Sequence, residues 1–208
     1  MFKRYTAIIG MLLVWWPLTG FSADASVQLR QFIDSVSSAT GQFSQATLAE
    51  TGQAGGPGQQ GEFSFERPGK FKWHVRQPYE QLTLSDGKQL YQYDPDLAQV
   101  IVRGVDESVG ASPAAILFGS GQLDDSFNVT SLPESEGLSW LRAQPQGPDA
   151  GFAHVDIGFQ NGMPVRLLLL DSFGQTSRID LDNIVTNPDL APDEFTFTPP
   201  DGVDVVKM

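Results

Sequence analysis

The chain has 208 residues, enough for one domain with a sizeable core, and 25 acidic residues against 13 basic ones give it a net charge of −12. This acidic excess argues against binding to nucleic acid and against adsorption to anionic lipid. The absence of cysteine excludes disulfides, thiol nucleophiles, thiolate metal sites and an acylated amino-terminal cysteine.

The amino-terminal residues have the layout of a secretory signal peptide. Two basic residues precede an uncharged apolar run, 5–20, and a small-x-small site follows at 23–25. A membrane anchor is the alternative, but the run is shorter than the ~20 residues of a span, and Pro17 interrupts it. We therefore expect residues 1–25 to be cleaved at one of the two alanines of the site. The single remaining domain, 26–208, then has 11 basic and 24 acidic residues and a net charge of −13.

The mature chain is expected to begin with an amphipathic helix over residues 26–37. Apolar side chains recur there at spacings of three and four, at Leu29, Phe32, Ile33 and Val36. A first strand is expected over residues 41–50. The glycine-rich segment 51–61 lacks the lysine of a phosphate-binding loop, so we interpret it as the connection of a β-hairpin.

From residue 62 onwards apolar and polar residues alternate, which predicts a series of short strands. We expect them at 62–67, 71–77, 81–85, 88–94, 98–103, 126–131, 138–144, 152–160, 163–171, 175–184 and 194–198. Turn-forming pairs such as Asp86-Gly87 and Asn161-Gly162 separate the strands. The pattern predicts a mainly β (α+β) fold, an incomplete antiparallel β-barrel of about 11 strands with helices on its concave side.

One short segment between the strands is predicted to be helical. Ser112 suits the N-cap, Pro113 the first helical position and Gly119 the stop. The residues between them are all apolar: Ala114, Ala115, Ile116, Leu117 and Phe118. A helix that is apolar on every side must lie against an apolar surface.

Turn lengths predict which side chains share a face, because directly opposed residues of antiparallel strands point the same way. Two-residue turns at Pro78-Tyr79 and Asp86-Gly87, with a turn at Pro95-Asp96, group apolar side chains on one face. These are Phe71, Trp73, Val75, Leu82, Leu84, Tyr91, Tyr93, Val100 and Val102. The other face is expected to hold Lys72, His74, Arg76, Thr83, Gln92 and Arg103, together with Leu90 and Ile101.

The turn after Arg67 decides where that arginine lies. A three-residue turn at Pro68–Lys70, with Gly69 at positive φ, opposes Phe65 to Trp73, whereas a two-residue turn opposes it to a lysine, so we prefer the longer turn. Arg67 then lies on the same face as Phe63, Phe65 and Phe71, at the strand end and the mouth of the apolar face. Two interpretations stay open: an ordinary core with Arg67 at its rim, or an apolar cavity that too few helical residues fill.

Five segments in chain order resemble the family of periplasmic outer-membrane lipoprotein carrier proteins, LolA. They are RPGKFKW (67–73), LTLSDGKQLYQYDPDLAQV (82–100), SPAAILFG (112–119), DSFGQTSRIDL (171–181) and EFTFTPPDGVDVV (194–206). The resemblance covers essentially the whole mature chain. It implies an unclosed barrel with a helical lid over a hydrophobic cavity, a chaperone rather than an enzyme, and no cofactor.

The resemblance also implies partners. The protein is expected to accept triacylated lipoproteins from an inner-membrane release complex of the LolCDE type. It would carry them through the periplasm of a Gram-negative bacterium to an outer-membrane receptor of the LolB type. The receptor has a similar fold but is itself a lipoprotein, so the lack of cysteine favours the carrier. A related envelope-stress regulator has a second domain for which this chain has no room. A monomer without stable membrane insertion is expected.

Residue roles follow from the resemblance where the motifs match. Arg67 matches an arginine that gates the lid through backbone carbonyls, Phe71 an aromatic linked to cargo uptake, and 114–118 the lid helix. The expected acyl-chain cavity is lined by Phe63, Phe65, Phe71, Trp73, Val75, Leu82, Leu84, Tyr91 and Val100. Lys72 stands where many members have arginine. The chain also ends soon after Val206, where some members have a longer tail that adds a final strand; this leaves the role of that tail open.

An enzyme and a binding module for a small hydrophobic ligand are the alternative classes. Neither HExxH nor GxSxG occurs. We interpret the histidines as exposed structural residues and the paired aspartates as turn or solvated residues rather than metal ligands. These candidates are His74, His154, Asp94, Asp96, Asp180 and Asp182.

Overall fold

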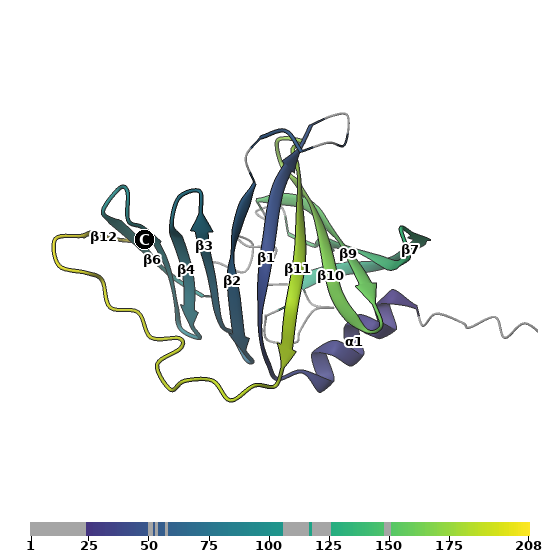
Figure 1. Ribbon diagram of the computed structural model, residues 1–208, viewed down its shortest axis with the longest axis horizontal. Coiled ribbons are helices and arrows are strands. Elements are labelled where there is room, and N and C mark those ends of the chain that lie inside the picture. The colour runs from purple at the N-terminus through teal and green to yellow at the C-terminus, as the bar shows by residue number, and fades with distance from the viewer. Residues whose placement is uncertain are drawn as a thin grey trace, which may run out of the picture.

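The computed structural model describes residues 24–49, 52, 54–56, 58–105, 117, 126–147 and 151–208. Across these residues one helix accompanies 12 strands (Figure 1). The elements are α1 (Ala25–Ser35), β1 (Ser38–Leu48), β2 (Gln59–Glu66), β3 (Lys70–Gln77), β4 (Gln81–Asp86), β5 (Gln89–Asp94), β6 (Gln99–Gly104), β7 (Phe127–Ser135), β8 (Leu138–Pro145), β9 (Phe152–Gln160), β10 (Met163–Asp171), β11 (Thr176–Thr186) and β12 (Asp204–Lys207).

All strands belong to one curled sheet in the order β12-β6-β5-β4-β3-β2-β1-β11-β10-β9-β8-β7 (Figure 1). Antiparallel pairing of β1 with β11 joins two meanders, β1–β6 and β7–β11. The expectation of a mainly β, unclosed barrel is confirmed. One strand departs from the antiparallel pattern, because β12 pairs with β6 in parallel.

The predicted elements mostly agree with the observed ones. Helix α1 begins after Asp24, whose Oδ1 accepts a 2.9 Å hydrogen bond from the amide of Ser26, and Val36 ends it in an extended conformation. Strands β1 and β2 pair as an antiparallel hairpin, as expected, but Gln59–Gly61, predicted to lie in the connection, already belong to β2. The strand expected at 194–198 is wrong, and β12 was not expected.

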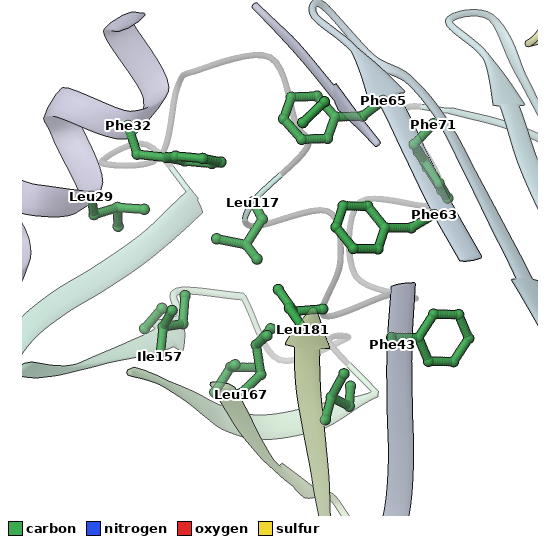
Figure 2. Packing of buried hydrophobic residues seen from close by; sticks show 14 of the residues in the cluster. Leu29, Phe32, Phe43, Phe63, Phe65, Phe71, Leu117, Ile157, Leu167 and Leu181 are labelled. Carbon is green, nitrogen blue, oxygen red and sulfur yellow. The ribbon is translucent and has the colours of Figure 1, made fainter. Parts of the chain in front are cut away.

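The face of the sheet that packs on α1 is called the inner face. Phe63 and Phe65 of β2 point from it toward Leu117, which lies between them and Phe32 of α1 (Figure 2). Leu167 and other apolar residues of β7–β11 continue the same core on the far side of β1. Helix α1 covers this second half, since it packs against β7, β8, β9 and β10. Leu90 of β5 extends the same core on the other side of β3.

The turn between β3 and β4 shows that the face predicted for the residues of β4–β6 is wrong. Its innermost β3–β4 pair is Val75 with Gln81, so five residues, 76–80, form the hairpin loop, and Trp73 pairs with Thr83 and Lys72 with Leu84. A loop with an odd rather than the expected even number of residues moves every following side chain to the opposite face. The apolar residues predicted to share the face of Trp73 lie on the outer face instead: Leu82, Leu84, Tyr91, Tyr93, Val100 and Val102. Thr83, Gln92 and Arg103 correspondingly lie on the inner face with Leu90 and Ile101.

The turn between β2 and β3 agrees with the face predicted for these two strands. It has the predicted three residues and Gly69 at φ +76°, but these are Arg67, Pro68 and Gly69, so the turn begins one residue earlier than expected and includes Arg67. Phe65 pairs with Phe71 rather than with Trp73, but this shift of two residues keeps both on one face. The prediction that Phe63, Phe65, Phe71, Trp73 and Val75 share a face is confirmed.

The chain between β11 and β12, residues 187–203, here called the C-terminal strap (Figure 1), packs against part of the apolar outer face. Its Phe197 ring lies 5.5 Å from the ring of Tyr91 and 5.6 Å from that of Tyr93, between centroids. Its Glu194 accepts hydrogen bonds from Ser64 (2.8 Å) and from Lys72 (3.2 Å). The alternation of EFTFT at 194–198 thus reflects side chains that pack on the sheet, not a strand within it.

Candidate functional site

The inner face of β1–β3 carries three stacked aromatic rings, here called the aromatic shelf. The rings of Phe43 and Trp73 stack with centroids 3.7 Å apart and an interplanar angle of 21°, and Phe63 lies 6.0 Å from Trp73 at the same angle. Phe43 and Phe63 are buried, whereas Trp73 is partly exposed. Trp73 is therefore the ring of the shelf that an apolar ligand could contact directly.

Two glycines make room for the shelf. A Cβ on Gly41 would stand 2.6 Å from the ring of Phe63, and a Cβ on Gly61 would stand 2.7 Å from the ring of Phe43. The Gly61 Cβ would also come within 2.0 Å of the carbonyl oxygen of His74. These sites therefore admit no larger residue without a shift of ring or backbone.

Arg67 joins the sheet to the end of α1 and to Leu117. Its Nε donates a 3.1 Å hydrogen bond to the carbonyl oxygen of Val36, and an Nη donates one of 2.5 Å to that of Leu117. Its backbone amide donates to the carbonyl oxygen of Ser37 at 2.8 Å. A guanidinium carries five N–H donors in a rigid fork, which suits several carbonyl oxygens at once. Arg67 thus ties three separate segments together.

Aromatic rings flank the same guanidinium. Its central carbon lies 4.9 Å from the ring centroid of Phe65 and 5.7 Å from that of Phe32. Burial lowers the pKa of Arg67 to about 10, which still leaves the side chain charged at neutral pH. Cation–π attraction to the two rings compensates part of the lost hydration.

Asn187 also fixes the link between α1 and β1, through its side-chain amide. Its Oδ1 accepts hydrogen bonds from the amides of Ser37 (2.8 Å) and Ser38 (3.2 Å), and its Nδ2 donates to the carbonyl oxygen of Ser35 (3.1 Å). Asn187 has φ +50°, a conformation that asparagine tolerates better than most residues. The short link between α1 and β1 is therefore fixed by Arg67 and Asn187 together.

The predicted lid helix is described only at Leu117, which is buried in the core between β2 and α1. Ala114, Ala115, Ile116 and Phe118 lie outside the described residues. Leu82, Leu84, Tyr91 and Val100, predicted to line the cavity, do not join the aromatic shelf, because the register places them on the outer face. Phe43 and Asn187 were missed by sequence reasoning. The glycine that opposes each shelf phenylalanine is a signal that could have indicated the stack.

The residues considered for catalysis have structural roles in the fold. His74 lies on the outer face as expected but is buried rather than exposed, with Nε2 2.8 Å from a Glu80 carboxylate oxygen. Asp94 caps the β5–β6 turn by accepting from the amide of Leu97. Asp180 accepts hydrogen bonds from Arg166 and Arg178, so the expectation of a simply solvated residue is wrong. Within the described ranges no three His, Cys, Asp or Glu side chains gather as metal ligands.

The carboxylate of Asp156 on the outer face is held in an ion pair with Arg142. Arg142 donates from Nε and an Nη of its guanidinium to Asp156 at 2.7 and 2.8 Å, with His154 nearby. Burial and the charge of Arg142 lower the pKa of His154. This arrangement keeps the imidazole neutral at neutral pH and gives it no adjacent nucleophile among the contacts described. Among the described residues, no helix has the length and hydropathy of a membrane span.

Comparisons with known proteins agree with the fold. The sequence profile of the family described as outer membrane lipoprotein carrier protein LolA matches residues 34–198. A Bordetella avium protein named outer-membrane lipoprotein carrier protein is 57% identical over 206 residues, covering 99% of this chain and 97% of that protein. A protein of the same name from Cupriavidus taiwanensis is 43% identical over 193 residues, covering 89% of each chain.

A solved structure gives the same fold. The crystal structure of an uncharacterized conserved protein from Thermus thermophilus aligns with a TM-score of 0.55 at 12% identity, covering 89% of this chain and all (100%) of that one. At this identity the likeness concerns the fold alone. The profile match and the two close relatives establish the family: the chain belongs to the outer membrane lipoprotein carrier protein (LolA) family.

Proposed function

We propose that this protein is a periplasmic chaperone that binds the acyl chains of lipoproteins and carries them between the two membranes. Family membership supports this proposal, because its relatives are named outer-membrane lipoprotein carrier proteins. The observation that carries it is the position of Arg67, which joins an aromatic surface to the carbonyl oxygens of Val36 and Leu117. Because these hydrogen bonds can break and release both segments, Arg67 suits the role of a gate over the aromatic surface.

The aromatic shelf suits the transport of acyl chains. Burying a methylene is worth about 0.8 kcal/mol, so a dozen buried methylenes contribute roughly 10 kcal/mol. A carrier must shield the chains and still release them. Contact with Trp73, which stacks on Phe43 and Phe63, would give this shielding without a tightly fitted pocket.

The gate is proposed to work by exchanging hydrogen bonds. In the described state Arg67 fixes the end of α1 and Leu117 against the sheet. Release of these bonds would let both segments move and would expose Phe65 and its neighbours to cargo. Because the pKa of Arg67 is about 10, the guanidinium stays protonated and its donors stay available at periplasmic pH.

Partners and location follow from the same proposal. Cleavage of residues 1–25 would place the domain 26–208 in the periplasm of a Gram-negative cell. A release complex of the LolCDE type would load triacylated lipoproteins, and a receptor of the LolB type would receive them. The acidic surface disfavours direct adsorption to anionic bilayers, so delivery would depend on protein partners.

The proposal can be tested with spheroplasts that make an epitope-tagged outer-membrane lipoprotein. Added mature protein should release the tagged lipoprotein into solution as a complex. Trp73→Asp should release far less, and Leu97→Asp, at an exposed turn, should release as much as the wild type. Mass spectrometry of the isolated protein then identifies the cargo. A folded protein that releases nothing, or that holds only a small lipid, would contradict lipoprotein carriage.

A further inference from the structure

The inner face continues beyond the aromatic shelf into a group of polar side chains, here called the polar corner: Thr83, Gln92 and Arg103. Pairing carries one row of the face from Trp73 to Thr83 and Gln92. The neighbouring row runs from Phe71 through Ser85 and Leu90 to Arg103. Adjacent strands lie about 4.8 Å apart, so Arg103 stands about 14 Å from Phe71 on the same face.

Arg103 is an arginine of this corner with unused hydrogen-bonding capacity. The side chain is half-buried, and its Nε is shielded from solvent without a hydrogen-bond partner. The arginines of the outer face differ, because Arg142 and Arg166 each donate to carboxylates. A buried donor of a charged group that lacks an acceptor is costly, and such a group calls for a functional explanation.

The chemistry of the corner limits what could satisfy it. A guanidinium donates and cannot accept, so its partner must carry acceptor oxygens. Thr83 and Gln92 can add further donors beside it. The shelf at the other end of the same face favours apolar chains. Together the two ends fit an amphiphile whose oxygens occupy one end of its chains.

We infer that the polar corner binds the ester carbonyl oxygens at the glyceryl head of the acylated cargo, with Arg103 as the principal donor, while the acyl chains lie along the aromatic shelf. This inference rests on the proposed carrier function and adds an orientation to it. The head group lies near β6 and the chains run toward β1. Arg103 thereby distinguishes esterified chains from bare hydrocarbon.

The test measures binding of two synthetic triacylated lipopeptides by fluorescence displacement. One carries normal ester links, and the other has ether links that lack the carbonyl oxygens. Arg103→Leu should weaken binding of the ester compound about tenfold and leave the ether compound within twofold, and Arg103→Lys should recover part of the loss. Arg76→Leu, an exposed outer-face change, should alter neither. Circular dichroism and thermal melts confirm that each variant is folded.

The outcomes separate the two proposals. If the wild type binds neither lipopeptide, the carrier function itself is contradicted. If the wild type binds both but Arg103→Leu weakens them equally, or weakens neither, the ester subsite is overturned while carriage stands. A final experiment measures the lipid that the protein extracts from phosphatidylglycerol vesicles. If Arg103→Leu reduces the lipid extracted from them but not ester lipopeptide binding, the corner recognises phosphate and the inference is wrong.

Discussion

The guanidinium of Arg67 lies 3.1 Å from the carbonyl oxygen of Val36, at the point where α1 ends and β1 is about to begin. Replacing it removes this bond and the one to Leu117, which together hold the described state by about 1–3 kcal/mol. If that state is the closed one, Arg67→Leu shifts the equilibrium toward the open state. We then expect an acyl probe to bind about tenfold more tightly and to leave more slowly for the receptor.

Stopped-flow transfer of a fluorescent lipopeptide from the carrier to the receptor measures this effect. Arg67→Lys keeps the charge but not the fork, so its behaviour should resemble that of the leucine variant more than that of the wild type. Unchanged uptake and transfer in both variants would remove the gating role from Arg67.

Trp73 and Lys72 are neighbours in β3 that point to opposite faces, which gives a matched pair of substitutions. Trp73→Asp places a charge in the aromatic shelf and should weaken an acyl probe at least tenfold. Lys72→Gln loses only a partly exposed ion pair with Glu194 and should leave probe binding within twofold. Titration with a fluorescent fatty-acid derivative compares them, and equal losses would mean that the shelf is not the binding surface.

Gly61→Ala tests whether the shelf needs its glycines. The added Cβ would meet the carbonyl oxygen of His74 at 2.0 Å, so the backbone must move. We expect a loss of about 1–3 kcal/mol in the free energy of unfolding, measured by urea denaturation. Gly104→Ala has no neighbouring atom within 4 Å and should change stability by less than about 0.5 kcal/mol. A loss as large at Gly104 would point to a general effect of glycine replacement.

Phe197→Ala tests the strap. The ring packs between Tyr91 and Tyr93, so its removal should cost about 2–3 kcal/mol of stability, somewhat less than a fully buried phenylalanine. Probe binding should persist, because these residues lie on the outer face. Leu97→Ala, at an exposed turn, serves as the control for stability. A Phe197 variant of normal stability that loses probe binding would place the strap in the binding site instead.

The lowered pKa of Asp180 predicts that the stability of the fold depends on pH. Burial opposes the shift, but hydrogen bonds from Arg178 and Arg166 outweigh it and lower the pKa of the carboxyl. A carboxyl with a lowered folded pKa stabilises the fold above its unfolded value near 3.8, and this contribution is lost as pH falls through the folded value. Asp180→Asn should therefore destabilise clearly at pH 7 and much less at pH 3, by urea denaturation. A deficit of the same size at both pH values would exclude this linkage.

The sequence allows the inner face of β2 and β3 to be predicted, because Gly69 and the phenylalanines on either side of it favour one turn length. It does not allow the faces of β4–β6 to be predicted. Apolar and polar residues alternate along these strands, but the more apolar face is the outer one, part of which packs against the strap. Pro78 and Tyr79 read equally well as the centre of a shorter or longer turn, so the pattern cannot choose between registers that differ by one residue.

Long-range contacts explain the other omissions. Asn187 acts on Ser37 and Ser35, which are about 150 residues earlier in the chain. A lone asparagine before a proline indicates a turn locally and says nothing of that partner. The unused donor of Arg103 likewise becomes visible only when the register brings it to the inner face.

The parallel pairing of β12 with β6 has a consequence for solubility. A sheet that exposes apolar surface when it opens risks joining other sheets through unpaired backbone groups at its margins. At one margin β12 occupies the hydrogen-bonding groups of β6. At the other, β7 contains Pro133, which has no amide hydrogen to donate, within a break in its register. Under the proposed gating, the interior would then open while both margins of the described sheet offer neighbouring molecules little backbone on which to aggregate.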